Sequence, residues 1–165
     1  MADIGYLVLL FYLIGGFVAV YSNCSNGWIR NDDSCYLFVD LHRKTWLQAK
    51  SDCEARNSHL VVIESKAEND FVKNQLAKLH PGTEDQFWTA GNDLVTENNW
   101  VWGNTSDIFE VSFWHPGEPN QSAGEEDCLT FYTRYRFDWN DEHCNKPMPY
   151  ICEVEDYIDS GSIIG

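Results

Sequence analysis

Two stretches of the chain repeat apolar residues at the spacing of an α-helix. In the first, Trp46, Ala49 and Cys53 recur three and four residues apart after Thr45, a residue type that caps helix N-termini. The second begins with the capping-box sequence Ser65-Lys66-Ala67-Glu68. Its apolar stripe consists of Phe71, Val72, Leu76 and Leu79, and His80-Pro81-Gly82 ends it. At helical spacing such stripes indicate positions that face a core.

The remaining apolar residues gather in short runs that are typical of β-strands. The runs are residues 28–29, 35–39, 59–63, 87–90, 100–102, 129–132 and 149–154. After residue 87, long loops rich in Gly, Asn, Pro and acidic residues separate the runs. Loops of this length inside a compact domain usually carry function, so the second half of the chain is where we expect a site.

The two ends of the chain differ from its middle. From Ile4 to Val20 the chain is uncharged and largely apolar, short for a membrane span, and small residues follow near Ser22. We interpret residues 1–22 as a secretory signal peptide. A short uncleaved anchor is the alternative, because the usual positively charged first segment is missing. Residues 23–154 would then form the domain, and residues 155–165 an acidic tail that we expect to be disordered.

All the cysteines lie after the apolar leader: Cys24, Cys35, Cys53, Cys128, Cys144 and Cys152. An even number of cysteines in an exported chain predicts disulfide bonds and an extracellular location. A thiolate zinc site is disfavoured because no close Cys-x-x-Cys pair is present. Cys24 with Cys35 is a plausible local pair, but spacing alone does not choose among the other pairings.

The charge of the chain is strongly negative and unevenly distributed. The formal net charge is −15, and residues 79–133 contain ten acidic residues without any lysine or arginine. Such runs are commonly solvated surfaces, but here the acidic residues stand among Trp88, Trp100, Trp102 and Trp114, which are typical of a packed core. An acidic segment of this kind favours cation binding and disfavours nucleic acid as a partner.

One set of polar residues offers oxygen atoms suited to a hard divalent cation. Its members are Glu118, Asn120, Glu126, Asn140 and Asp141. Carboxylate and carboxamide oxygens together are the ligands that Ca²⁺ prefers. An amide NH2 beside a carboxylate can donate to and accept from the same hydroxyl, which is a layout that binds sugars. The sequence therefore predicts a calcium site that also recognises sugar hydroxyls.

With these motifs the chain resembles a C-type lectin domain in its long form. The resemblance runs from Cys24 to Val154 and rests on both helices, Phe87-Trp88-Thr89-Ala90-Gly91, Glu118-Pro119-Asn120 and Trp139-Asn140-Asp141. It implies an α+β double-loop fold in which two helices pack against two small antiparallel sheets. It also implies the disulfides Cys24–Cys35, Cys53–Cys152 and Cys128–Cys144. The last of these would close the segment that carries the sugar site.

The resemblance assigns roles to the oxygen donors. It implies that Glu118, Asn120, Glu126, Asn140 and Asp141 bind the principal Ca²⁺ and the sugar, and that a cis peptide bond precedes Pro119. In the family, Glu-Pro-Asn accompanies binding of mannose, N-acetylglucosamine, glucose and fucose, whereas Gln-Pro-Asp accompanies galactose. The expected partners are glycans with vicinal equatorial hydroxyls, such as those on microbial surfaces. We expect a secreted pattern-recognition or agglutinating lectin that forms homo-oligomers, since single sites bind weakly.

An auxiliary calcium site and several modification sites are further expectations. The resemblance implies auxiliary ligands Asp93, Glu97, Glu126 and Asp127, although Gln121 stands where a carboxylate is common, and loop acids that only face solvent are the alternative. Glycosylation sequons begin at Asn23, Asn104 and Asn120. Asn104 is the expected acceptor and Asn23 a second candidate, because a glycan on Asn120 would consume the amide that the site needs. His115 and His143 flank the site and could make ligand release depend on pH.

Two other classes of function use the same residues. Glu118 and Glu126 could act as acid and base in glycoside hydrolysis, but carboxylates surrounded by other acids and amides favour a metal, so we expect no enzyme. A matrix or mineral-associated structural protein would also suit an acidic surface. A structural role alone would not require all the oxygen donors of the principal site together.

Overall fold

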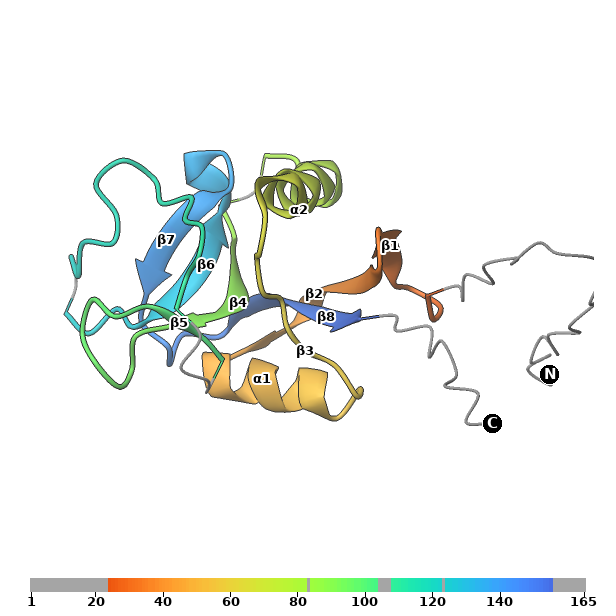
Figure 1. The fold of residues 1–165 in the computed structure, drawn as a ribbon, viewed down its shortest axis with the longest axis horizontal. Helices are drawn as coiled ribbons and strands as arrows, with labels where there is room; N and C mark the ends of the chain where they lie inside the picture. The colour runs from red at the N-terminus through yellow and green to blue at the C-terminus, as the bar shows by residue number, and fades with distance from the viewer. Residues whose placement is uncertain (1–23, 83, 104–107, 123, 156–165) are drawn as a thin grey trace, which may run out of the picture.

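The computed structural model describes residues 24–82, 84–103, 108–122 and 124–155 (Figure 1). Its elements are β1 (Ile29–Asn31), β2 (Ser34–Lys44), α1 (Trp46–Glu54), β3 (His59–Leu60), α2 (Lys66–Leu79), β4 (Gln86–Asn92), β5 (Val101–Trp102), β6 (Cys128–Tyr132), the 3-10 helix η1 (Thr133–Tyr135), β7 (Asp138–Glu142) and β8 (Met148–Glu155). The segment predicted to be a signal peptide lies outside the described residues. Of the predicted tail only Glu155 is described, and it ends β8.

Both helices begin where the capping residues predict. Thr45 and Gln48 form a reciprocal capping box on α1, with the Gln48 N–H 3.4 Å from Thr45 Oγ1 and the Thr45 N–H 3.2 Å from Gln48 Oε1. On α2, Ser65 Oγ accepts from the Glu68 N–H at 3.1 Å, but the Glu68 carboxylate accepts from the Glu64 N–H and not from that of Ser65. The predicted stripe is buried at Val72 and Leu76, whereas Leu79 in the last turn is 49% exposed.

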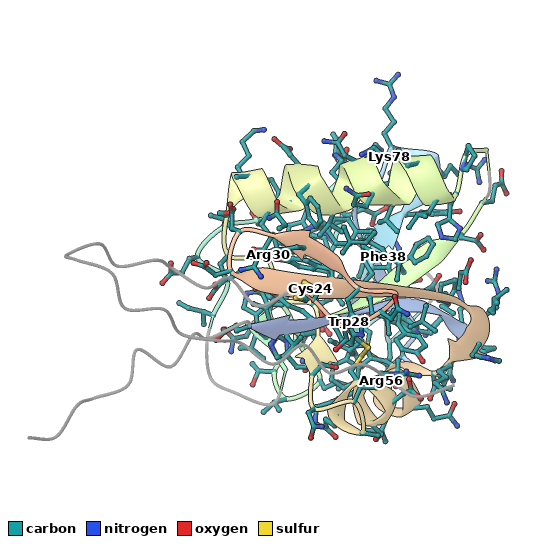
Figure 2. All side chains as sticks on the ribbon, turned by 90° about the vertical axis from the view of Figure 1, so that its right-hand side faces the viewer. Cys24, Trp28, Arg30, Phe38, Arg56 and Lys78 are labelled. Atoms are coloured by element: carbon teal, nitrogen blue, oxygen red, sulfur yellow. A yellow bond between two sulfur atoms is a disulfide. The ribbon has the colours of Figure 1, made fainter. Side chains whose placement is uncertain are left out.

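The strands form one mixed sheet in the order β1-β2-β8-β4-β6-β7, with β3 paired to β8 and β5 to β4. Every pairing is antiparallel except that of β4 with β8, which run parallel at Trp88 and Tyr150. The two antiparallel groups that we expected are therefore present, and this pairing joins them. Helices α1 and α2 lie on opposite sides of β2 and β8 (Figures 1 and 2).

The three disulfides pair as the resemblance implies: Cys24–Cys35, Cys53–Cys152 and Cys128–Cys144. Cys53–Cys152 joins α1 to β8, and Cys128–Cys144 joins the first residue of β6 to the segment after β7. Because β2 and β8 are antiparallel neighbours with Ser34 opposite Glu155, the described chain begins and ends at the same side of the molecule. The long loops after β4 occupy the opposite side (Figure 1).

Trp139 on β7 is the centre of an aromatic core beneath these loops. Its side chain is fully buried, and its ring centroid lies 5.3–5.8 Å from those of Trp102, Phe109, Phe113 and Trp114. Its indole N–H donates to Asn69 Oδ1 of α2 at 3.1 Å. This packing fixes the part of β7 that presents Asn140 and Asp141, the next two residues along the strand.

Candidate functional site

The segment from Glu118 to Asn120 forms a sharp turn in the long loop between β5 and β6. The Glu118–Pro119 peptide bond is cis, as the resemblance implies. The Glu118 N–H donates to the His115 carbonyl at 2.9 Å, and the Asn120 amide donates to a Glu118 carboxylate oxygen. The side chains of Glu118 and Asn120 therefore lie together on one side of the turn.

Asp141 anchors this turn to the sheet. Its side chain is almost fully buried, and Oδ2 accepts hydrogen bonds from the backbone N–H groups of Asn120 at 2.9 Å and Gln121 at 3.0 Å. The other oxygen, Oδ1, is buried and has no hydrogen-bond partner in the described part of the chain. A buried carboxylate oxygen without a partner is costly, so its environment is suited to a bound cation.

Glu126 and Asn140 complete the predicted set. Glu126 is 5% exposed, and its Oε2 lies 3.3 Å from Ser122 Oγ, which donates to it. Asn140 is 8% exposed, and its amide donates to Gln86 Oε1 at 3.2 Å and to the Asp141 carbonyl. Glu126 is therefore held by Ser122 of the same loop, whereas Asn140 is held by Gln86 of β4 and by the neighbouring Asp141 carbonyl on β7.

The electrostatics of the turn favour a positive ion. Partial burial, followed by contact with the Asp141 carboxylate, raises the pKa of Glu118 to about 7, while a hydrogen bond from the Tyr135 hydroxyl opposes the rise. Carboxylates that crowd one another in this way are stabilised in their charged form by a cation. The residues present, three carboxylates and two carboxamides, fit Ca²⁺ in ligand type.

A second acidic group lies beside the first, around the loop that follows β4. Asp93 is 3% exposed, Oδ2 accepts from the Asn98 N–H at 2.8 Å, and Oδ1 is buried without a partner among the described residues. Burial, with repulsion from Glu97 and Asp127, raises the pKa of Asp93 to about 6. The backbone N–H of Asp93 donates to the Asp127 carbonyl at 3.1 Å, so the acids of the predicted auxiliary site lie near one another.

Gln121 connects the two acidic groups. Its side-chain amide donates to Glu97 Oε1 at 2.9 Å, and its side-chain carbonyl accepts from the Glu126 N–H at 2.8 Å. A carboxylate at this position could not donate to Glu97. The departure from the family pattern therefore replaces a possible metal ligand with a hydrogen-bonded bridge.

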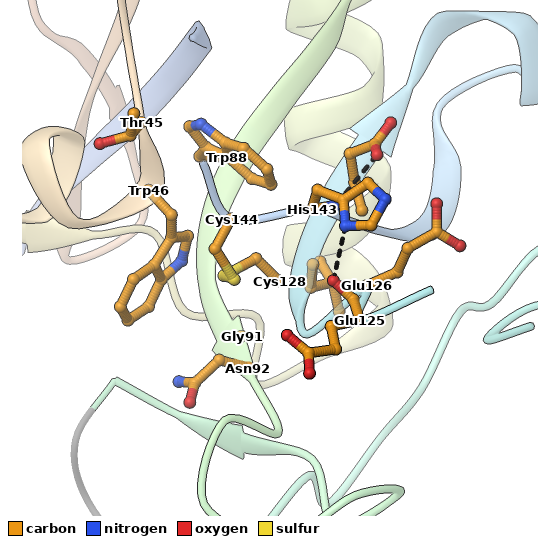
Figure 3. The surroundings of a disulfide bond; sticks show 12 residues. Thr45, Trp46, Trp88, Gly91, Asn92, Glu125, Glu126, Cys128, His143 and Cys144 are labelled. Carbon is orange, nitrogen blue, oxygen red and sulfur yellow. Dashed lines mark hydrogen bonds between the residues drawn. A yellow bond between two sulfur atoms is a disulfide. The ribbon is translucent and has the colours of Figure 1, made fainter. Parts of the chain in front are cut away.

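Glu142 and His143 come close to Glu126 without having been predicted as ligands. One ligand atom from each of the three lies within 4.8 Å of the others. However, Glu142 already accepts from Gln86 at 2.9 Å and from Lys146, and His143 Nδ1 lies 2.7 Å from the Glu125 carbonyl (Figure 3). That contact requires a proton on Nδ1, so His143 is hydrogen-bonded to the loop that carries Glu126.

Tyr135 lies beside the site, although the sequence did not predict it there. Its ring stacks on that of His115 at 3.9 Å with planes 6° apart, and burial, followed by its interaction with Glu118, raises the pKa of the Tyr135 hydroxyl. His115 in turn contacts Asp138 at 3.3 Å, and Lys73 of α2 donates to the same carboxylate at 2.6 Å. These partners are far apart in sequence, so no local signal identifies them. The expected glycosylation residues Asn23 and Asn104 lie outside the described residues.

Comparison with known proteins gives a consistent family assignment. The family model of the Lectin C-type domain matches residues 42–154. A perlucin-like protein of Mytilus galloprovincialis is 34% identical over 90% of this chain and 96% of its own length. Lactose-binding lectin l-2 of Anguilla japonica is 33% identical over 78% of this chain and 76% of its own. The C-type carbohydrate-recognition domain of cow CD23, solved in the presence of a GlcNAc2Man3 oligosaccharide, aligns with a TM-score of 0.69 and 28% identity over 81% of this chain and 96% of that domain.

Proposed function

Since the chain belongs to the C-type lectin domain family, we propose that it is a secreted lectin that binds glycans of the mannose type through Ca²⁺. The observation that carries this proposal is the contact between the cis Glu118 turn and Asp141, whose buried Oδ1 has no partner among the described residues. Since a carboxylate oxygen is rarely left unpaired in a protein interior, a ligand that completes it is the simplest explanation.

The proposed ligands have distinct tasks. Glu118, Glu126 and Asp141 supply negative charge, and Asn120 and Asn140 supply neutral carbonyl oxygens together with NH2 donors. The ion would supply electrostatic attraction for two neighbouring sugar hydroxyls. Each hydroxyl would then donate to a carboxylate oxygen and accept from an amide. In this scheme Asp141 also orients the turn, because its Oδ2 holds the backbone of Asn120 and Gln121.

The order of acid and amide around Pro119 would select the sugar. The known relatives include a lactose-binding lectin and a domain solved with a mannose-containing oligosaccharide, so membership of the family alone does not fix the sugar. Glu118 before Pro119 and Asn120 after it place the acceptor and the donor in the arrangement associated with mannose-type sugars. We therefore propose mannose, N-acetylglucosamine, glucose and fucose as the ligands.

A glycan array tests both parts of this proposal. We expect the wild-type protein to bind mannose-type glycans with Ca²⁺ present and to lose them when the ion is chelated. The double variant Glu118→Gln with Asn120→Asp should shift binding toward galactose. Glu54→Gln with Asn74→Asp makes the same chemical changes on exposed positions of α1 and α2 and should leave the profile unchanged. Binding that persists in excess chelator would contradict the calcium mechanism and favour a structural, protein-binding role.

We also propose export, binding without turnover and recognition of microbial surfaces. The three disulfides support an oxidising location. In the described part of the chain, no helix has the length and apolar character needed to span a membrane. If the lectin forms oligomers, it should agglutinate mannan-coated particles in Ca²⁺ and elute as more than a monomer. Release of free sugar from a bound glycan would revive the glycosidase alternative.

A further inference from the structure

The turn between β6 and β7 presents two arginines to solvent on either side of a fixed aromatic residue. It consists of η1 followed by Arg136 and Phe137, and these last two residues have positive φ angles of 54° and 63°. Non-glycine residues seldom adopt this conformation, and two in succession require support from the surrounding structure. Phe137 is buried and Tyr135 half-buried, whereas Arg134 and Arg136 are exposed. The aromatic residues therefore anchor the turn, and the arginine side chains are exposed to solvent.

This turn lies directly beside the proposed sugar site. Tyr135, which stands between the two arginines in the sequence, stacks on the His115 ring at 3.9 Å, and the His115 carbonyl accepts from the Glu118 N–H at 2.9 Å. A second contact, with Tyr132 at 4.8 Å between ring centroids, supports the Tyr135 ring from β6. The turn that carries the arginines is thus connected through Tyr135 and His115 to Glu118, a proposed ligand of Ca²⁺.

The acidic side chains near the turn form their ion pairs with other residues and not with its arginines. Asp138 is paired with Lys73 and His115, and Asp85, whose carbonyl accepts from the Thr133 N–H, is paired with Arg43. Neither Arg134 nor Arg136 makes an ion pair with any residue that the structure describes. These are the first lysine or arginine residues after Lys78 in a chain with a net charge of −15. Two exposed arginines in an otherwise acidic region are suited to attracting an anion to this turn.

We propose that Arg134 and Arg136 form an extension of the sugar site that binds an anionic substituent on the glycan. The shared chemistry is a planar or tetrahedral oxyanion, carried as a sulfate ester, a phosphate ester or a carboxylate. Guanidinium groups bind such oxyanions with paired N–H donors, and the resulting bonds are stronger than those between neutral groups. This inference rests on the proposed function, since the primary sugar must first occupy the site beside Glu118.

Binding of matched neutral and anionic sugars tests the extension. The folded full chain, with Ca²⁺ present, is titrated with a neutral mannose-type oligosaccharide and with its sulfated, phosphorylated and uronic-acid counterparts. We expect the wild type to bind at least one anionic form about five- to tenfold more tightly than the neutral form. The variant Arg134→Gln with Arg136→Gln should lose this advantage and keep its affinity for the neutral sugar within about twofold. The counterpart whose affinity exceeds that of the neutral sugar by the largest factor identifies the anionic group that the extension binds.

A charge-matched control separates a local effect from the net charge of the protein. Lys50→Gln with Lys66→Gln removes two positive charges from α1 and α2 and should leave the anionic preference intact. Raising NaCl from about 0.05 M to about 0.5 M should weaken only the anionic ligand. Equal wild-type affinity for neutral and anionic sugars, or equal loss in both double variants, overturns the extension while leaving the proposed function standing. Failure to bind even the neutral sugar refutes the proposed function, and the extension with it.

Discussion

Acidification should release Ca²⁺ from the proposed principal site, because a proton competes for Glu118. Without a cation, burial and the neighbouring Asp141 carboxylate raise the pKa of Glu118 to about 7, so the side chain is largely protonated at mildly acidic pH. Ca²⁺ requires the carboxylate, and binding of the ion must therefore expel the proton. The apparent affinity for Ca²⁺ should fall as the pH drops below 7 and level off above it.

The size of this effect follows from one competing proton. The apparent dissociation constant is multiplied by one plus ten to the power of the pKa minus the pH. With a pKa of about 7, this factor is about 30 at a pH of about 5.5 and close to one at a pH of about 8. The folding stability of the unliganded protein should depend on pH in the opposite direction. Its folded form binds the Glu118 proton more tightly than the unfolded chain, so this stabilising contribution is present below a pH of about 4.5 and is lost as the pH rises through 7.

Calorimetric titration with Ca²⁺ in non-chelating buffers measures the affinity at both pH values. The variant Glu118→Gln should bind more weakly at pH 8, but its affinity should depend much less on pH, because the titrating group is gone. Asp93→Asn serves as a parallel variant, because it removes the other carboxylate of the two acidic groups whose pKa is raised, in this case to about 6. A wild-type change of less than about threefold between the two pH values would refute the reasoning.

Two further predictions concern the framework of the site. Gly91→Ala should destabilise the fold by about 1–3 kcal/mol, measured by urea unfolding, because the new Cβ would lie 2.8 Å from Leu129 Cβ. An unchanged urea midpoint would show that β4 can move away from Leu129. Replacing Cys53 and Cys152 with serines should lower the free energy of unfolding by about 2–5 kcal/mol. The loss should exceed that for Cys24 and Cys35, because the first disulfide closes a loop of 99 residues and the second a loop of 11. The reverse order would contradict the chain-entropy explanation.

The sequence was most informative where structure depends on local interactions. Capping at Thr45 and Ser65 defined both helix starts, since a cap is formed within one turn. Strand limits were less predictable. β2 extends to Lys44, beyond the predicted end at Val39, and β7 was not predicted as a strand at all. Its residues include Asn140 and Asp141, whose polar side chains mask the strand because they face a site and not a core.

The residue types of the candidate site could be read from the sequence, but its hydrogen-bond network could not. Residue types and spacing identified Glu118 and Asn120 as oxygen donors, whereas the cis peptide bond before Pro119 was implied only by the family resemblance, and the structure has that bond. The roles of Gln121 and Tyr135 depend on contacts with residues brought together only by folding. From the sequence Gln121 is only a missing carboxylate, whereas in the structure its side-chain amide links Glu97 to the backbone N–H of Glu126.

The adjacent ends of the described chain have a consequence for display on a surface. The described chain begins and ends on the side of the sheet opposite the long loops, because β2 and β8 run side by side and Cys24 is bonded to Cys35 of β2 (Figure 1). A linker fused at either end would leave the loop face pointing away from its support. Copies tethered through their termini would therefore all present the same face outward. On a bead, a sensor chip or a multimeric carrier, orientation would be uniform whichever end was used.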